Sequence, residues 1–290
     1  MLDISDLEML VREFLGVLST IEARHRSAKS AMKRELENLD RRHKQLEGMA
    51  EDDRKVFGMS FNVFHFRDPE NGSLIPYDVK QTDLKEAVKL MYVDANRQAQ
   101  WHLVEAYEAF EDFAISVYTR IRRGAIEFRP SFDKNAELTR LQLKNKAGSV
   151  INVFKNTLDE LKNFETINVI GVNFRLILVL IEKMRHVIVH RRGQVDDIEG
   201  LFERILKGAC LYSDGARGPI AKRSIEGYLG KGDYQGLIVL LEQPMFKVGG
   251  LEAKIDRLDN LLSALSTYAV ALCRCLTRHF STGPEVGTSR

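Results

Sequence analysis

Two sets of apolar positions spaced seven residues apart run through the first fifty residues. One set is Ile4, Val11, Leu18, His25, Met32, Leu39 and Leu46, and the other is Leu7, Phe14, Ile21, Ala28, Glu35, Arg42 and Met49. The three polar exceptions lie in the middle and later part, so the stripe is strongest at its start. This repeat predicts a long, coiled-coil-like helix over residues 1–52. Its partner is either another copy of the chain or the rest of its own domain.

Alternation replaces the seven-residue repeat after Asp52. Phe57, Met59, Phe61 and Val63 alternate with small or polar residues, and a strong turn sequence, Asp-Pro-Glu-Asn-Gly, follows at 68–72. A small β-hairpin is therefore predicted within residues 53–82. The aromatic rings of Phe61, Phe64 and Phe66 suit either base stacking or a core. We assign them to the core, which is the commoner role.

Helical periodicity returns over residues 83–280. Asp83 and Glu86 resemble a capping box and predict a helix from there to about Arg122, in one or two pieces. Further helices are predicted over about 136–164, with a possible break at Gly148, then over 172–190 and 251–280, while 194–250 forms looser, glycine-rich turns. The last helix has an unbroken apolar stripe. The tail, 281–290, is expected to be disordered.

These elements predict an all-α fold: an antiparallel helical bundle over 83–280, extended by the long N-terminal helix and a small β-hairpin insertion. A chain of 290 residues suits one compact domain with an added helical element. The three cysteines lack the spacing of a disulfide framework, the first residues lack the features of a signal peptide, and the longest apolar run is Leu176–Ile181. We therefore expect a cytoplasmic protein without a membrane span.

Charge is concentrated at one place. The net charge is only +2, so no overall basic field indicates nucleic-acid binding. Within residues 175–195, however, Glu182 is the single acidic residue, against Arg175, Lys183, Arg185, Arg191 and Arg192. Two histidines, His186 and His190, lie in the same stretch. Arginine binds phosphate through a planar fork, and histidine transfers protons near neutral pH, so this helix end suggests phosphodiester cleavage.

Three other interpretations fit this helix end. Glu182, His186 and His190 share one helical face and have the chemistry of metal ligands, although an ion pair at the surface explains the same spacing. Cations at a helix C-terminus are also stabilised by the helix dipole alone. No nucleotide-binding loop, HExxH motif or Gly-x-Ser-x-Gly elbow occurs in the chain. We expect neither a metal nor another cofactor.

The order of these features resembles the HEPN family. Arg185, the polar His186, three further residues and His190 match its Arg-x4-His motif, with Gly193 just beyond the helix. The helix around residues 101–113 corresponds to the family's opening helix, and the apolar helix 251–276 corresponds to its closing helix. The resemblance covers about residues 83–280.

The resemblance implies an activity and assigns roles. Many HEPN proteins are metal-independent endoribonucleases that act as dimers with a composite active site. Arg185 would bind the scissile phosphate, His190 would move protons during attack by the ribose 2′-hydroxyl, and His186, at a position that is most often asparagine, would orient the site. Lys183, Arg191 and Arg192 would bind RNA phosphates. For Glu108 and Glu111, on the opening helix, solvated charge is the simpler interpretation than a place at the site.

Such domains are common in bacterial toxin–antitoxin and anti-phage defence systems. The resemblance thus implies an RNA-cleaving effector controlled by an antitoxin or another regulatory protein. The alternative is a non-catalytic HEPN dimer that acts as an RNA-binding or protein-interaction scaffold. The intact pair of Arg185 and His190 favours the enzyme.

Overall fold

The computed structural model describes residues 4–57, 60–122, 128, 138–248 and 251–281, and they are mostly helical, as predicted. The chain divides into two compact units. The first contains Met1–Ala23 and Ala99–Arg290, and the second contains Arg24–Gln98. Two long helices, α1 (Ile4–Glu47) and α3 (Leu84–Ile121), contribute to both units. α3 is continuous, whereas its pattern allowed one or two pieces.

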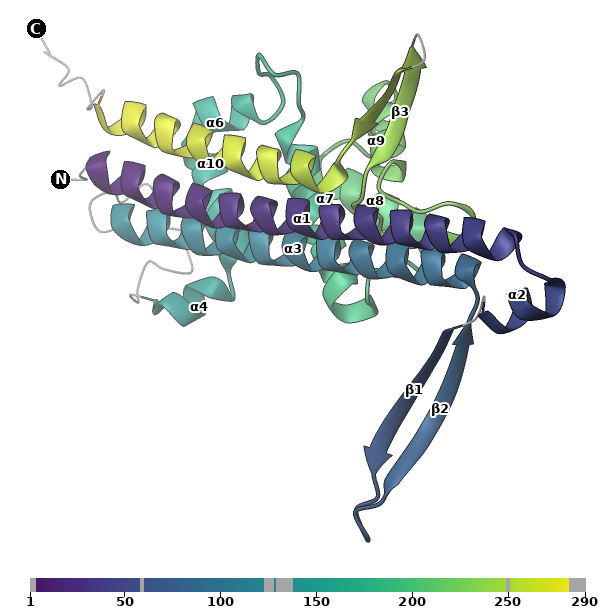
Figure 1. The fold of residues 1–290 in the computed structure, drawn as a ribbon. Coiled ribbons are helices and arrows are strands. Elements are labelled where there is room, and N and C mark those ends of the chain that lie inside the picture. The colour runs from purple at the N-terminus through teal and green to yellow at the C-terminus, as the bar shows by residue number, and fades with distance from the viewer. Residues whose placement is uncertain (1–3, 58–59, 123–127, 129–137, 249–250, 282–290) are drawn as a thin grey trace, which may run out of the picture. The chain divides into compact units, whose positions relative to one another are not determined.

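In the first unit, the start of α1 packs against α3 and against α10 (Arg257–Ser281) (Figure 1). Phe14 stacks on Phe113 at 5.1 Å between ring centres, and the Cys273 thiol lies 3.9 Å from the backbone oxygen of Leu7. The positions of the predicted repeat that are buried in this part of α1 are Leu7, Phe14, Leu18 and Ile21. Over these residues, the partner of the helix is therefore its own domain.

Shorter helices complete the first unit. They are α4 (Arg140–Lys144), α5 (Ala147–Thr157), α6 (Asp159–Phe164), α7 (Phe174–Arg191), α8 (Ile198–Gly208), α9 (Arg217–Glu226) and the 3-10 turn η3 (Gly232–Tyr234). The helix predicted over 136–164 is thus three helices, because Lys146, between α4 and α5, and Leu158, between α5 and α6, both have non-helical backbone angles. Gly148 lies inside α5 and does not break it. The region predicted as loose turns holds α8 and α9.

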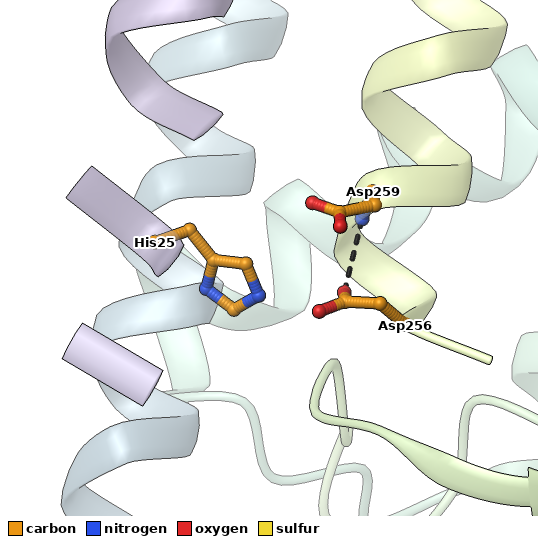
Figure 2. A group of neighbouring side chains, drawn as sticks. All are labelled: His25, Asp256 and Asp259. Atoms are coloured by element: carbon orange, nitrogen blue, oxygen red, sulfur yellow. Dashed lines mark hydrogen bonds between the residues drawn. The ribbon is translucent and has the colours of Figure 1, made fainter. Parts of the chain in front are cut away.

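A second hairpin precedes α10, and its second strand lies where the sequence predicts helix. It consists of β3 (Gln243–Val248) and β4 (Leu251–Ile255), paired antiparallel. Leu251 and Ile255 are four residues apart, as on a helix, but a Gly-Gly pair before them is a hairpin signal that outweighs this spacing. α10 begins only at Arg257. The Asp256 carboxylate accepts a hydrogen bond of 3.1 Å from the Asp259 backbone N–H at this helix start (Figure 2). His25, also drawn there, belongs to the second unit.

The second unit contains the rest of α1, α2 (Glu51–Phe57), the predicted hairpin and the start of α3. The hairpin pairs β1 (Ser60–Arg67) with β2 (Leu74–Thr82), with a bulge after Phe64. Its turn is the predicted one, closed by a 2.8 Å hydrogen bond from the backbone of Gly72 to Asp68.

Two aromatic side chains of this hairpin, Phe64 and Phe66, are not core residues, contrary to the prediction. Phe64 is 65% exposed and Phe66 is 40% exposed, while the side chain of Phe61 lies outside the described residues. The two rings instead contact the Tyr77 ring of β2, edge to face, with 6.3 and 6.5 Å between ring centres. A sheet of only two strands offers them little more than each other to pack against. The predicted tail, 281–290, lies outside the described residues except for Ser281, which ends α10.

A buried carboxylate joins four helices of the first unit. Glu165, just after α6, is fully buried. Its carboxylate lies 2.8 Å from Lys155 Nζ of α5 and 3.0 Å from Arg175 Nε of α7, and it accepts a 2.9 Å hydrogen bond from the Tyr268 hydroxyl of α10. Burial, and then the Glu165 charge, raise the pKa of Tyr268 well above its usual value. The hydroxyl therefore stays protonated and donates.

We expect Glu165→Ala to lower the free energy of unfolding by about 3–5 kcal/mol, because it leaves two cations and a hydroxyl without their shared partner. Urea denaturation measures this. The matched control is Glu160→Ala, which removes an exposed carboxylate that pairs with Arg278 and should cost less than about 1 kcal/mol. Equal losses in the two variants would show that the buried network contributes no more than a surface pair.

Candidate functional site

The predicted site residues lie in the second half of α7. The helix begins with Asn173, whose side chain accepts a 3.0 Å hydrogen bond from the Leu176 backbone. Its inner face is buried through Ile181, Met184, Val187 and Ile188. This packing fixes the rotation of the helix, so Lys183 and Arg185 are partly exposed and His186, His190, Arg191 and Arg192 are exposed.

The backbone at the end of α7 is fixed to Ile238, which the Gln100 side chain of α3 also binds. Arg192 and Gly193 both have left-handed backbone angles, with φ of 54° and 80°, and both backbone N–H groups point to the Val187 oxygen. Gly193 also accepts a 2.9 Å hydrogen bond from the Ile238 backbone N–H. The buried Gln100 amide of α3 lies against Gly193 and donates to the Ile238 oxygen at 2.7 Å. A side chain at 193 would overlap this amide, which explains the glycine that the sequence marks just beyond the helix.

Arg185 is held against α3. Its guanidinium donates to a Glu108 carboxylate oxygen at 3.1 Å and lies 6.0 Å from the centre of the Tyr107 ring. The side chain of Arg185 is one-third exposed. Its Nε is buried and, among the described residues, has no hydrogen-bond partner. Glu108 is therefore part of the site, which the solvated-charge interpretation did not foresee.

Two further groups of α3 surround this ion pair. Burial raises the pKa of Glu111, which the positive charge of Arg185 opposes and the negative charge of Glu108 reinforces. Burial also raises the pKa of the Tyr107 hydroxyl. Arg185 thus lies against an acidic and aromatic surface of α3. In this surface Glu108 forms the ion pair with Arg185, and Glu111 has a raised pKa.

The two histidines form a pair on the outer face of α7. The rings of His186 and His190 have centres 4.5 Å apart. Burial lowers the pKa of His186, and the charges of His190, Lys183, Arg191 and Arg204 lower it further, because each disfavours a second positive charge nearby. Arg185 does not share this face with His190, since five residues along one helix correspond to a rotation of about 140°.

A pocket of about 470 Å³ lies between α7 and α8. Arg185, His186, Lys183 and Arg191 line it, whereas His190 and Arg192 are not among its lining residues. α8 and the turn before it supply polar groups that the sequence prediction missed: Asp196, Asp197 and Arg204. They lie beyond the end of the motif helix, and no spacing rule connects them with the motif.

The metal interpretation of the helix end is not supported by the geometry. Within the described part of the chain, the ligand atoms of Glu182, His186 and His190 do not all lie within 4.8 Å of one another. Glu182 instead accepts a 2.6 Å hydrogen bond from Lys183. The observed arrangement is a surface ion pair, in which Lys183 is the partner of Glu182.

Comparison with protein-family models, with curated proteins and with solved structures finds no match for this chain. None of the helices in the described ranges has both the length and the hydrophobicity needed to cross a lipid bilayer.

Gly193→Ala should destabilise the protein more than Gly171→Ala does. Both glycines have left-handed angles, φ 80° and 71°, so both substitutions cost roughly 1 kcal/mol in backbone strain. At Gly193 the new methyl group also displaces the Gln100 amide, whereas the space around Gly171 is open. Thermal unfolding of the two variants measures the difference, and equal melting temperatures would contradict it.

The pKa of His186 should lie below the usual histidine value of 6.5, which favours the neutral form at pH 7. An NMR titration of the imidazole carbon-bound protons measures this value. His190→Asn should raise it, because one of the neighbouring positive charges is removed. His65→Asn, which changes an exposed histidine of the β1–β2 hairpin, is the control and should leave it unchanged. A His186 pKa above 6.5 would contradict the cationic surroundings described above.

Proposed function

We propose that the protein is a metal-independent endoribonuclease of the HEPN type. One observation carries the proposal: α7 presents an anchored, half-buried arginine on one flank and an exposed histidine pair on the other. An arginine prepositioned by Glu108 suits a phosphate, since it loses little freedom on binding. The resemblance of the Arg-x4-His spacing supports the same reaction.

In this reaction the ribose 2′-oxygen attacks phosphorus, the bond from phosphorus to the 5′-oxygen breaks, and a 2′,3′-cyclic phosphate and a 5′-hydroxyl result. Arg185 binds the non-bridging oxygens and offsets their growing negative charge. His190 accepts the 2′-hydroxyl proton, and a proton returns to the 5′-oxygen. His186 orients the neighbouring ring, and its lowered pKa suits a neutral partner at pH 7.

The active enzyme is a homodimer in this proposal. Arg185 and His190 are offset by about 140° on one helix, so a single α7 does not present both to the same phosphate. A second α7 facing the first completes the cleft with the missing group. By the same resemblance, the chain is a cytoplasmic toxin or anti-phage effector, kept in check by an antitoxin or regulatory protein.

A non-catalytic scaffold is the second candidate, and one contact favours it. Glu108 already occupies the Arg185 guanidinium at 3.1 Å, so a phosphate must compete with a carboxylate for it. A dimer that binds RNA or a protein partner without cutting would preserve this ion pair.

Cleavage of total RNA in EDTA separates the two candidates. We expect the wild-type protein to leave 2′,3′-cyclic phosphate ends, and Arg185→Ala and His190→Ala to cut at least about 100-fold more slowly, because each removes a group that acts in the transition state. Cyclic ends are detected by ligation with an RNA ligase specific for them.

Matched controls are Arg274→Ala, which removes an exposed arginine of α10, and His65→Ala, which removes an exposed histidine of the hairpin. Both should cut like the wild type. RNA that stays intact under activating conditions, or site variants that cut at the wild-type rate, would rule out the endoribonuclease and leave the scaffold.

A further inference from the structure

The pocket between α7 and α8 gathers more cations than one scissile phosphate uses. Four permanent positive charges line it: Lys183, Arg185, Arg191 and Arg204. Three carboxylates share the lining, those of Glu182, Asp196 and Asp197. His186 also lines the pocket, among these charges. The pocket is therefore a polar recess that continues from Arg185 towards α8.

The cations differ in how far their donors are engaged. Lys183 donates to Glu182 at 2.6 Å, Arg191 donates to Asp196 at 2.6 Å, and Arg185 donates to Glu108 at 3.1 Å. The Arg204 guanidinium is 3.7 Å from the Asp197 carboxylate, beyond hydrogen-bond distance. Within the described ranges of the chain it makes no hydrogen bond, so its donors remain available to a ligand.

Asp197 is itself engaged elsewhere. Its Oδ1 accepts a 2.8 Å hydrogen bond from the Gly200 backbone N–H, and this caps α8. The carboxylate lies so close over Gly200 that a side chain at that position would overlap it. The cap holds the carboxylate at the helix start and away from full contact with Arg204.

We propose that Arg204 is a further RNA-binding residue, which holds a phosphate next to the scissile one in the pocket between α7 and α8. This inference rests on the proposed endoribonuclease function. Arg185 and His186 line the same pocket, so a strand whose scissile phosphate is bound by Arg185 places a neighbouring phosphate within it. Lys183 and Arg191 contribute charge from the α7 side, and Arg204 contributes the guanidinium fork from α8.

The experiment measures binding without cleavage. A fluorescently labelled single-stranded oligoribonucleotide with 2′-O-methyl groups throughout lacks the attacking hydroxyl. Its affinity for the 290-residue chain is measured by fluorescence anisotropy at several salt concentrations. We expect Arg204→Ala to weaken binding about tenfold and to reduce the salt slope by about 0.7, the value for one phosphate contact on a single strand. The affinity of Arg204→Lys should lie between those of the wild type and Arg204→Ala, since lysine keeps the positive charge but lacks the guanidinium fork.

Asp197→Asn is the second informative variant. Asparagine caps a helix as well as aspartate does, so α8 stays intact while the negative charge beside Arg204 is removed. Binding should become several-fold tighter. Arg274→Ala is the matched control and should bind like the wild type.

Wild-type affinity and salt slope in Arg204→Ala, or no measurable binding by the wild-type protein, would overturn the proposal. Parallel assays with unmodified RNA distinguish its failure from that of the endoribonuclease. If binding depends on Arg204 but no RNA is cut, the endoribonuclease proposal is rejected and the RNA-binding role of Arg204 is retained. If cutting depends on Arg185 and His190 but binding does not depend on Arg204, the endoribonuclease proposal is retained and the role of Arg204 is rejected.

Discussion

The buried Glu165 carboxylate is the constraint on which the candidate site depends. Its side chain joins Lys155, Arg175 and Tyr268, and its backbone oxygen accepts a 2.9 Å hydrogen bond from Phe174 at the start of α7. A charge in the protein interior is tolerated only where its partners are held in place. The same partners also fix where α7 begins, and therefore the direction in which Arg185 and the histidines point.

The sequence predicts those parts of the fold that repeat. The seven-residue pattern of α1, the alternation of the first hairpin and the apolar stripe of α10 recur often enough to outweigh single exceptions. The breaks at Lys146 and Leu158 and the β3–β4 hairpin depend on one or two residues each, so the pattern does not reveal them. The rings of Phe64 and Phe66 show a further limit, since periodicity indicates a face and not what covers it.

For the candidate site, the sequence identifies the side chains of α7 but not their surroundings. Spacing along one helix is local information, and it groups His186 with His190 correctly. Glu108, Glu111 and Arg204 come from α3 and α8, and only tertiary packing brings them to α7. Their charges matter as much as the motif does. A cationic motif in the sequence becomes, in the folded chain, a set of cations among carboxylates.

Arg192 gives this site a cost in stability that composition alone does not show. It occupies the left-handed position at the end of α7, with φ of 54°, where glycine is the usual residue because it has no side chain to strain the backbone. An arginine there costs roughly 1–2 kcal/mol relative to an unstrained residue. Stability and local charge therefore oppose each other at one position. The chain keeps a positive charge beside the histidine pair where folding alone would favour glycine.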